Sequence, residues 1–376
     1  MLPMDPLERL SIARRLMDDY ARRTGLTGKG GDASHRYLWT DAFAVQTFFG
    51  LAAVLPDPSY RDLALKLIEE VHAHLGRFHR RDTRKGWISG LPKLEGAAHP
   101  TAGGLRIGKS LPERGMEEPY NERLEWDRDG QYFHYLTRWV QALLDAGWET
   151  SYKKYVLWAA ELVVAGGRFI YKKGSDTRMY WKMSTDLSRP LVASMGVHDP
   201  LDGLVSALGA LEQAPQKAPV LQPVIKDLQA CARGLDWTTT DPLSIGGLLL
   251  NLARVMELQS HKVELPESIQ PQKLLTDSVQ GLEAYRRTGQ HRLGVEQRLP
   301  FRDCGLSLGL RVVTAMELPA GSATNLKQLD RFGSLADDIE AFWSTPRHQE
   351  ASTWTGHLDI NAVTLAASLT AAVHSL

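Results

Sequence analysis

"INAVTLAASLTAAV", residues 360–373, decides the fold. The segment is long enough for several helical turns and carries no charged side chain on any face. "IGGLLLNLA", residues 245–253, has the same character. A helix that is apolar all round is surrounded by protein, whereas an amphipathic helix has one face in water. Segments of this kind predict the inner helices of an all-α protein.

Apolar segments alternate with amphipathic ones along the whole chain. The apolar helical period predicts inner helices at about 38–55, 130–146, 200–213, 242–257, 304–317 and 358–375. Amphipathic outer helices are predicted at about 5–23, 58–78, 150–168, 217–233, 271–288 and 323–344. Because short connections join antiparallel neighbours, we expect six helical hairpins that close into an (α/α)6 toroid. No linker divides the sequence, which predicts a single domain over residues 1–376.

Two segments interrupt the helical period. Residues 79–128 are rich in Gly and Pro, and a stretch of this length inside a compact domain is either functional or disordered. We expect an ordered β/loop excursion lying over a pocket, with a flexible linker as the alternative. In residues 169–197, alternating apolar positions flank Gly174 and predict a short β-hairpin.

The charge balance argues against several partners. Lys plus Arg and Asp plus Glu both number 44 in the 376 residues, so the formal net charge is zero. A neutral chain has no global field to hold a nucleic acid or an anionic membrane, and neither partner is expected. A small-molecule or oligosaccharide substrate is the partner that we expect.

Cysteine usage and hydropathy bear on location and cofactors. Cys231 and Cys304 belong to no CxxC motif or Cys/His cluster, so we expect neither a disulfide framework nor a zinc site. No apolar run approaches the roughly 18 residues of a membrane span, and the N-terminus does not resemble a signal peptide. These features predict a cytoplasmic protein with reduced thiols, without a metal or another cofactor.

Charged and aromatic residues collect where the inner helices begin. "EWDRDGQ", residues 125–131, places four charges and a Trp at the start of the helix predicted at 130–146. The six starts carry, in chain order, His35, Arg36, Trp39 and Asp41; Glu125, Trp126, Asp127 and Asp129; His198, Asp199 and Asp202; Asp236, Trp237 and Asp241; Arg302 and Asp303; and Trp354, His357 and Asp359. If the inner helices run parallel, these residues converge at one end of the barrel.

Helix capping is the simpler interpretation of each Asp. A carboxylate at a helix N-terminus accepts free N–H groups of the first turn and suits the helix dipole. Asp199 and Asp241 each precede a Pro, as expected where a helix starts. Capping does not account for the Trp, His and Arg residues that accompany them.

The combination resembles the six-hairpin glycosidase superfamily. Six helical hairpins, with Asp, His and Trp at the inner-helix starts and a long Gly-rich excursion over that end, carry the resemblance. It implies a carbohydrate-active enzyme, since this fold hosts glycoside hydrolases, unsaturated-uronyl hydrolases, sugar epimerases of the acylglucosamine 2-epimerase type and some lyases. A fold supports many activities, so the site residues have to decide between them.

Hydrolysis of a glycosidic bond is the first prediction. It needs a carboxylic acid to protonate the leaving oxygen and a second carboxylate to attack or to activate water. By position, the resemblance implies Asp41 and Asp129 as this pair, with Asp127 as a further candidate. Trp faces cover apolar sugar faces and polar groups hold hydroxyls; the predicted substrate-binding residues are Trp39, Arg36, Glu125, Trp126, Arg106, Asp199, Asp202, Trp181, Trp354 and His357.

Two other functions stay open. Epimerases of this fold use His as proton carriers, and a His titrates near neutral pH; the candidates are His198, which we also count among the catalytic residues, and His35, His134 and His357. A non-catalytic carbohydrate-binding or scaffold protein is the third possibility.

The basic residues of the excursion bear on the substrate. They could form an anion site for a uronic acid or a sugar phosphate, or they could belong to a solvated loop. These residues are Arg77, Arg80, Arg81, Arg84, Lys85, Arg106, Lys109 and Arg114.

Overall fold

The computed structural model describes residues 4–28, 36–316 and 324–373. These residues are mostly helical, with only short strands, and the predicted all-α class is confirmed. They divide into two compact units. Unit 1 comprises Met1–Arg23, Gln46–Arg61 and Gly234–Leu376, and unit 2 comprises Thr24–Val45 and Asp62–Arg233.

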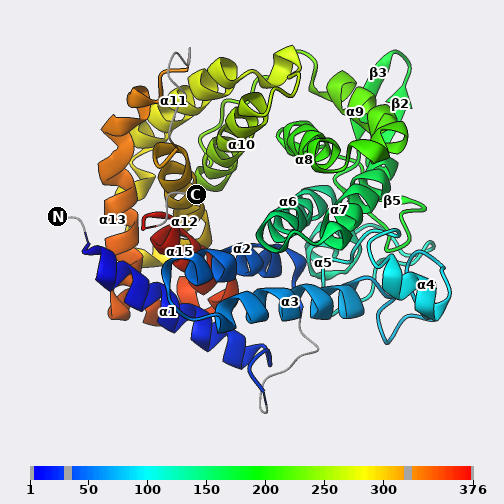
Figure 1. Cartoon of the computed structure of the whole chain (residues 1–376), viewed down its shortest axis with the longest axis horizontal. Helices are drawn as coiled ribbons and strands as arrows, with labels where there is room; N and C mark the ends of the chain where they lie inside the picture. Colours follow the sequence, from blue (N-terminus) through cyan, green and yellow to red (C-terminus); the bar gives the residue numbers. More distant parts are fainter. Residues whose placement is uncertain (1–3, 29–35, 317–323, 374–376) are drawn as a thin grey trace. The chain divides into compact units, whose positions relative to one another are not determined.

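Unit 2 is built from helical hairpins. Helix α6 (Phe133–Thr150) packs on α7 (Lys153–Gly166), and α8 (Asp199–Gln213) packs on α9 (Ala218–Ala232). Helices α6 and α8 also contact each other, so the two predicted inner helices are neighbours (Figure 1). The first half of α2 (Leu38–Val54) and most of α3 (Ser59–Leu75) complete the unit.

Unit 1 repeats this arrangement with other helices. It contains α1 (Pro6–Arg23), the second half of α2, α10 (Pro242–Ser260), α11 (Pro271–Thr288), α12 (Pro300–Thr314), α13 (Gly333–Ser344), α14 (Ser352–Thr355) and α15 (Leu358–Ala371). Helix α12 packs between α10 and α15. The α10 and α12 backbones approach closely, because a Cβ atom on Gly246 would lie 2.1 Å from the Gly305 carbonyl oxygen. Only glycine permits that spacing.

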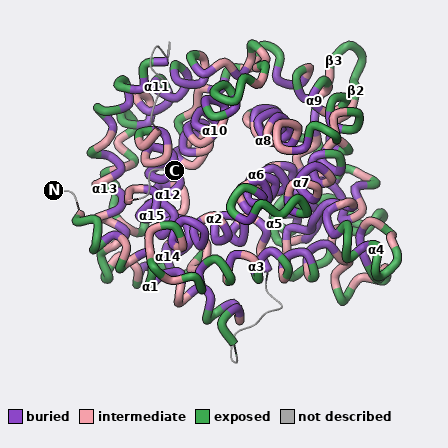
Figure 2. The backbone as a smooth tube through the Cα atoms, in the orientation of Figure 1, coloured by how far each residue is buried: buried purple, intermediate pink, exposed green. Residues whose placement is uncertain are grey.

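Burial follows the predicted alternation. Every residue of α15 from Asn361 to Ala371 is buried, as its uncharged sequence predicts. Figure 2 shows the predicted inner helices α6, α8, α10 and α12 as mainly buried, whereas α9 and α13 expose one face. The predicted helical hairpins and their inner and outer members are therefore confirmed within each unit. Closure of all six hairpins into one ring, and a single domain, involve both units and stay predictions.

Several helix starts differ from the sequence prediction. Helix α13 begins at Gly333 rather than near 323, because Leu326–Phe332 form a 3-10 helix, and α7 (Lys153–Gly166) begins three residues later than predicted. Helix α6 begins at Phe133 rather than at 130, because Gln131–Tyr132 form strand β1. Strand β4 (Lys182–Met183) pairs with β1 on one side and with β5 (Pro190–Val192) on the other. Helix α12 begins earlier than predicted, with Pro300 in its first turn, a position where a missing N–H costs nothing. The helix limits predicted at 317, 323 and 375 lie outside the described residues.

The two irregular segments are ordered. Residues 79–128 contain the short helices α4 (Lys93–Ala98) and α5 (Glu122–Asp127), and bridges join Arg77 to Trp87 and Leu111 to Arg128. The excursion is thus loop and short helix rather than strand. The predicted hairpin is confirmed as β2 (Ile170–Lys173) paired with β3 (Asp176–Met179), which turns at Gly174.

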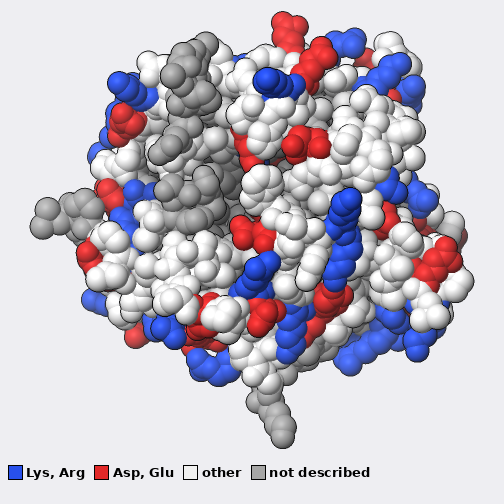
Figure 3. Space-filling view, viewed as in Figure 1, with Lys and Arg blue, Asp and Glu red and all other residues white. Residues whose placement is uncertain are grey.

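The surface carries both signs of charge. On the face shown in Figure 3, Lys and Arg side chains are interspersed with Asp and Glu side chains. None of the helices in the described ranges combines the length and apolar character needed to cross a bilayer.

Candidate functional site

The starts of α2, α6 and α8 come together in unit 2. The Trp39 ring, in the first turn of α2, lies 5.7 Å from the ring of His134 at the start of α6. His134 Nδ1 lies 3.9 Å from Asp199 Oδ1 at the start of α8. Three of the predicted groups of residues therefore converge, as parallel inner helices require.

An aromatic cluster surrounds His134. Neighbouring rings in it have centroids 4.8–5.9 Å apart, and its members are Tyr37, Trp39, Tyr132, His134, Tyr135 and Trp181. All except Tyr132 are partly exposed. Exposed aromatic faces beside polar groups suit the apolar C–H faces of a sugar.

Short strands and hydroxyl contacts hold the cluster in place. Trp181 precedes β4, and its carbonyl accepts a hydrogen bond from the Phe133 N–H at 3.4 Å. This contact brings Trp181 beside the start of α6. The hydroxyls of Tyr37 and Tyr135 lie 2.7 Å apart and hydrogen-bond across the starts of α2 and α6.

Asp199 and His134 have shifted proton affinities. Burial and, as a second cause, the nearby Asp202 together raise the pKa of Asp199 to about 7, although the hydrogen bond from the Gly196 N–H lowers it. Burial, with Arg138 as a second cause, lowers the pKa of His134 to about 3. At neutral pH the imidazole is therefore neutral, while the carboxyl is near the midpoint of its titration. Such groups are suited to proton transfer.

Asp129 lies in a buried ion pair. It is 1% exposed, its Oδ2 pairs with Arg106 Nη1, and its Oδ1 accepts from the Gly108 N–H at 3.1 Å. Arg106 also donates to the carbonyls of Arg77 and His74, at 2.6 and 2.8 Å. Both oxygens of Asp129 thus hold the chain in place, so this carboxylate is better suited to positioning the loop than to contacting a substrate.

Asp41 is similarly occupied. It is 2% exposed, and its Oδ2 accepts from the Tyr37 N–H at 3.1 Å, which stabilises the start of α2. Its Oδ1 lies 3.9 Å from Nη1 of Arg36, a side chain that is itself buried. Catalysis by Asp41 and Asp129 stays a prediction, but their surroundings are those of structural carboxylates.

Glu125 anchors the residues that precede α6. It is buried, and it accepts from Arg114 Nε at 2.9 Å and from Lys182 Nζ at 3.0 Å. Burial lowers the pKa of Lys182, and Glu125 opposes that shift. This network places Trp126, 51% exposed, with its ring 4.9 Å from that of Trp181. Asp127, beside it, is exposed.

The remaining predicted residues of unit 2 lie around the start of α8. Asp202 is partly exposed one turn after Asp199, and its N–H donates to the His198 carbonyl at 2.9 Å. His198, also partly exposed, immediately precedes the helix. His35 lies outside the described residues.

Unit 1 holds the other predicted residues, and most of them are structural. Trp354 is 2% exposed and stacks on Trp343, so it belongs to the core and has no exposed face for a sugar. Asp241 caps α10 by accepting from the Ser244 N–H at 2.9 Å, as predicted, and pairs with Arg302. His357 is exposed, with its ring 6.1 Å from that of Phe301.

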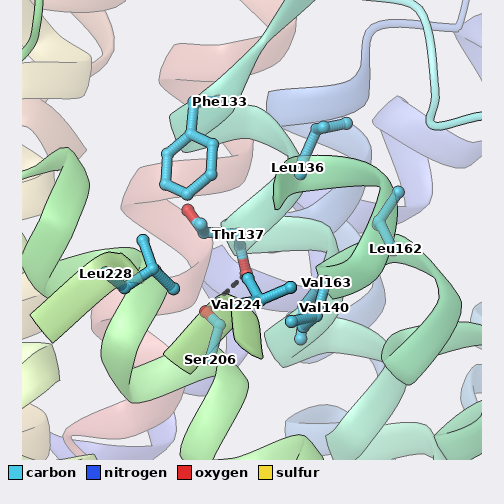
Figure 4. A pocket seen from close by; sticks show the side chains of 11 residues that line it. Phe133, Leu136, Thr137, Val140, Leu162, Val163, Ser206, Val224 and Leu228 are labelled. Carbon is cyan, nitrogen blue, oxygen red and sulfur yellow. Dashed lines mark hydrogen bonds between the residues drawn. The ribbon is translucent and has the colours of Figure 1, made fainter. Parts of the chain in front are cut away.

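A small apolar pocket lies inside unit 2, between α6, α7, α8 and α9 (Figure 4). Its lining includes Phe133, Val140, Leu162 and Leu228. The Ser206 hydroxyl donates to the Thr137 carbonyl at 3.3 Å and is already satisfied. Such a lining offers a sugar few polar partners, so we do not place the site there.

Several functional candidates were not singled out from the sequence. Tyr37, Tyr135 and Lys182 gave no signal, because a Tyr near a helix start is common and a Lys is seldom buried. "QYFHY", residues 131–135, was the available signal for the aromatic cluster. Within the described residues, no group of three or more His, Cys, Asp or Glu side chains is arranged to hold a metal ion.

Comparison with known proteins gives a fold-level likeness. No protein-family model matches the chain, and no curated protein matches its sequence. Among the solved structures that it resembles is the cellobiose 2-epimerase from Spirochaeta thermophila DSM 6192, with 14% sequence identity and a TM-score of 0.47. The match covers 88% of this chain and 85% of the epimerase. Because the likeness is this low, any function proposed for this chain has to be argued from its own residues.

Proposed function

We propose that this chain is a carbohydrate-active enzyme and that it epimerises or isomerises a sugar by proton transfer. The observation that carries the proposal is the His134–Asp199 pair, set among the partly exposed rings of the aromatic cluster. A sugar stacked on Trp39 or Trp181 would bring its reducing end, opened to the free aldehyde, to the two titratable groups. The sequence prediction ranked hydrolysis first; the occupied state of Asp41 and Asp129 favours the second prediction.

The chemistry follows from the two shifted groups. Epimerisation removes the proton on the carbon next to a carbonyl and returns a proton to the opposite face, so Asp199, once protonated, would give the proton back after the enediolate has turned over in the site. Ionised Asp199, with a pKa of about 7, is a base matched to neutral pH. Neutral His134 can donate a ring N–H to the enediolate oxygen, where negative charge develops. Their separation of 3.9 Å is longer than a hydrogen bond, so neither group is committed to the other.

Hydrolysis by a different pair is the second candidate. Asp199 and Asp202 lie three residues apart on α8, so their Cβ atoms are about 5–6 Å apart. Retaining glycosidases separate their carboxyl groups by about 5–5.5 Å, a spacing that two carboxylates on one face of a helix can adopt. An acid with a pKa near 7 would protonate the leaving oxygen.

One experiment separates the two reactions. Free aldoses, disaccharides and unsaturated uronides are incubated with the protein in D₂O and followed by proton NMR. Epimerisation exchanges the hydrogen next to the carbonyl for deuterium and forms a new sugar, whereas hydrolysis releases a reducing end. If neither reaction occurs and no sugar binds, the proposed function is wrong. Binding without turnover would instead favour the predicted non-catalytic carbohydrate-binding protein.

The pH dependence of kcat distinguishes epimerisation from hydrolysis independently. If Asp199 acts as a base, kcat rises as the pH increases through about 7, because the ionised form is active. If it acts as the acid of a hydrolase, kcat falls over the same range.

A further inference from the structure

The basic residues of the excursion differ in how their charges are used. Arg84 pairs with Asp82, Glu113 and Asp186 at 2.7–2.9 Å. Arg106 pairs with Asp129, and Arg114 with Glu125. These arginines hold the excursion together, so their charges are already neutralised within the chain. The predicted anion site cannot be built from them without breaking internal ion pairs.

Lys109 is placed differently. Its Nζ lies 5.2 Å from the centroid of the Tyr37 ring, at the edge of the aromatic cluster. The residue is partly exposed. Across residues 4–28, 36–316 and 324–373, no carboxylate forms an ion pair with it. Lys109 therefore brings a positive charge to the cluster without a counter-charge from those residues.

The backbone fixes the position of Lys109. We call residues 105–109 the strap. Within the strap, the Arg106 N–H donates a hydrogen bond to the Leu75 carbonyl at 3.0 Å, and the Ile107 N–H donates one to the Gly130 carbonyl at 2.9 Å. The Ile107 carbonyl accepts a hydrogen bond from the Leu38 N–H at 3.0 Å. The strap is thereby tied to the starts of both α2 and α6.

Gly108 brings the strap against the start of α2. Its φ is +98°, and a Cβ atom there would lie 1.9 Å from the Arg36 carbonyl oxygen. Only glycine allows this approach. Its N–H donates to Asp129, which explains why that buried carboxylate and Arg106 are present: they hold the strap that carries Lys109.

We propose that Lys109 binds an anionic substituent, first a carboxylate, of a sugar whose ring lies on the aromatic cluster. This inference rests on the proposed function, because it names the substrate class of that site. An ammonium group on a fixed backbone attracts a carboxylate or phosphate oxygen strongly when neither charge is fully solvated. The predicted uronic-acid substrate thereby depends on one lysine rather than on the arginines of the loop.

The test compares matched neutral and anionic sugars. Binding of D-glucose, D-glucuronate and D-glucose 6-phosphate is measured by titration calorimetry on the full chain, with wild type, Lys109→Met and Lys109→Arg. We expect wild type to bind an anionic sugar at least about tenfold more tightly than glucose. Lys109→Met should lose this preference with glucose binding unchanged, and Lys109→Arg should retain most of it.

Lys85→Met is the matched control. Its ammonium lies on the same excursion but donates to the Arg80 and Asp82 carbonyls, at 2.8 and 2.6 Å. We expect its loss to leave the preference intact. The two anionic ligands distinguish a carboxylate site from a phosphate site.

The outcomes separate this inference from the function on which it rests. If glucose binds as tightly as both anionic sugars, or if Lys109→Met keeps the preference, Lys109 is not an anion-binding residue, although the sugar site remains. If none of the three sugars binds to wild type and the wider panel also shows no turnover, both proposals are wrong.

Discussion

The inner-helix starts of the two units share a sequence pattern but differ in structure. Unit 1 uses its acidic residues internally: Asp303 accepts from Arg298 Nε at 2.8 Å and from Trp343 Nε1 at 3.0 Å, and Asp241 pairs with Arg302. In unit 2, Asp199 accepts one backbone N–H and faces the partly exposed His134.

The difference indicates that the hydrogen-bond donors around an Asp, rather than the residue type, separate a structural carboxylate from a candidate catalytic one. An Asp whose oxygens are satisfied by Arg, Trp and backbone N–H groups is part of the architecture. Burial raises the pKa of both Asp303 and Asp199, but Arg298, Trp343 and Tyr285 oppose the shift at Asp303, whereas a single backbone N–H opposes it at Asp199. Asp129, in unit 2, belongs with the structural group by this criterion.

The strongest test of the comparison is Asp199→Asn. An amide can neither take nor give a proton, so we expect kcat to fall about 10²- to 10⁴-fold, while the variant remains folded. Asp241→Asn, which removes charge from a cap in unit 1, should leave kcat near the wild-type value. Steady-state kinetics on the substrate found by NMR, with circular dichroism for folding, decide the matter. Wild-type turnover by Asp199→Asn would show that the pair is not catalytic.

At Asp303 we expect a large loss of stability without a loss of activity. Replacing it with Asn leaves the buried Arg298 without its counter-charge, and breaking a buried pair costs about 3–5 kcal/mol of unfolding free energy. Urea denaturation measures this loss. The kcat of the folded fraction should not change, and a selective loss of kcat would mean that unit 1 also contributes to catalysis.

The pH dependence of stability sharpens the comparison. Because the pKa of Asp199 is raised to about 7, the folded state binds its proton more tightly than the unfolded chain does. The stability from this proton is complete below the unfolded pKa of 3.8 and is lost as the pH rises through about 7. The total is at most about 4 kcal/mol, at about 1.4 kcal/mol per pKa unit.

Asp199→Asn lacks this dependence. We therefore expect the variant to gain stability relative to wild type as the pH is raised from 4 to 8, measured by urea denaturation at each pH. Parallel curves for the two proteins would show that the carboxyl has an ordinary pKa.

The smallest expected effect concerns Trp39. Its ring is partly exposed at the start of α2, so Trp39→Ala should weaken sugar binding by about 1 kcal/mol, with little change in Tm. Trp126→Ala, on the exposed α5, is the matched variant, for which sugar binding and Tm are measured in the same way. An unfolded Trp39 variant would indicate that this Trp is core, like Trp354.

The sequence pointed to the proposed site more closely than to the catalytic residues proposed within it. The rule that charged and aromatic residues mark inner-helix starts led to Trp39, Asp199 and Asp202, all of which lie at or near the aromatic cluster. The same rule selected Asp129 and Trp354, which are buried and engaged by the protein itself. A carboxylate looks the same in sequence whether an Arg reaches it or not.

The sequence by itself determined the all-α class, the alternation of buried and half-exposed helices, and the hairpin around Gly174, because periodic burial and turn formation are local properties of neighbouring residues. The tertiary structure alone decided which acids are neutralised and which rings stay exposed. Arg106 reaches Asp129 across 23 positions, and His134 faces Asp199 from another helix. Those distances depend on packing, which sets the donors, the burial and hence the proton affinity of each group.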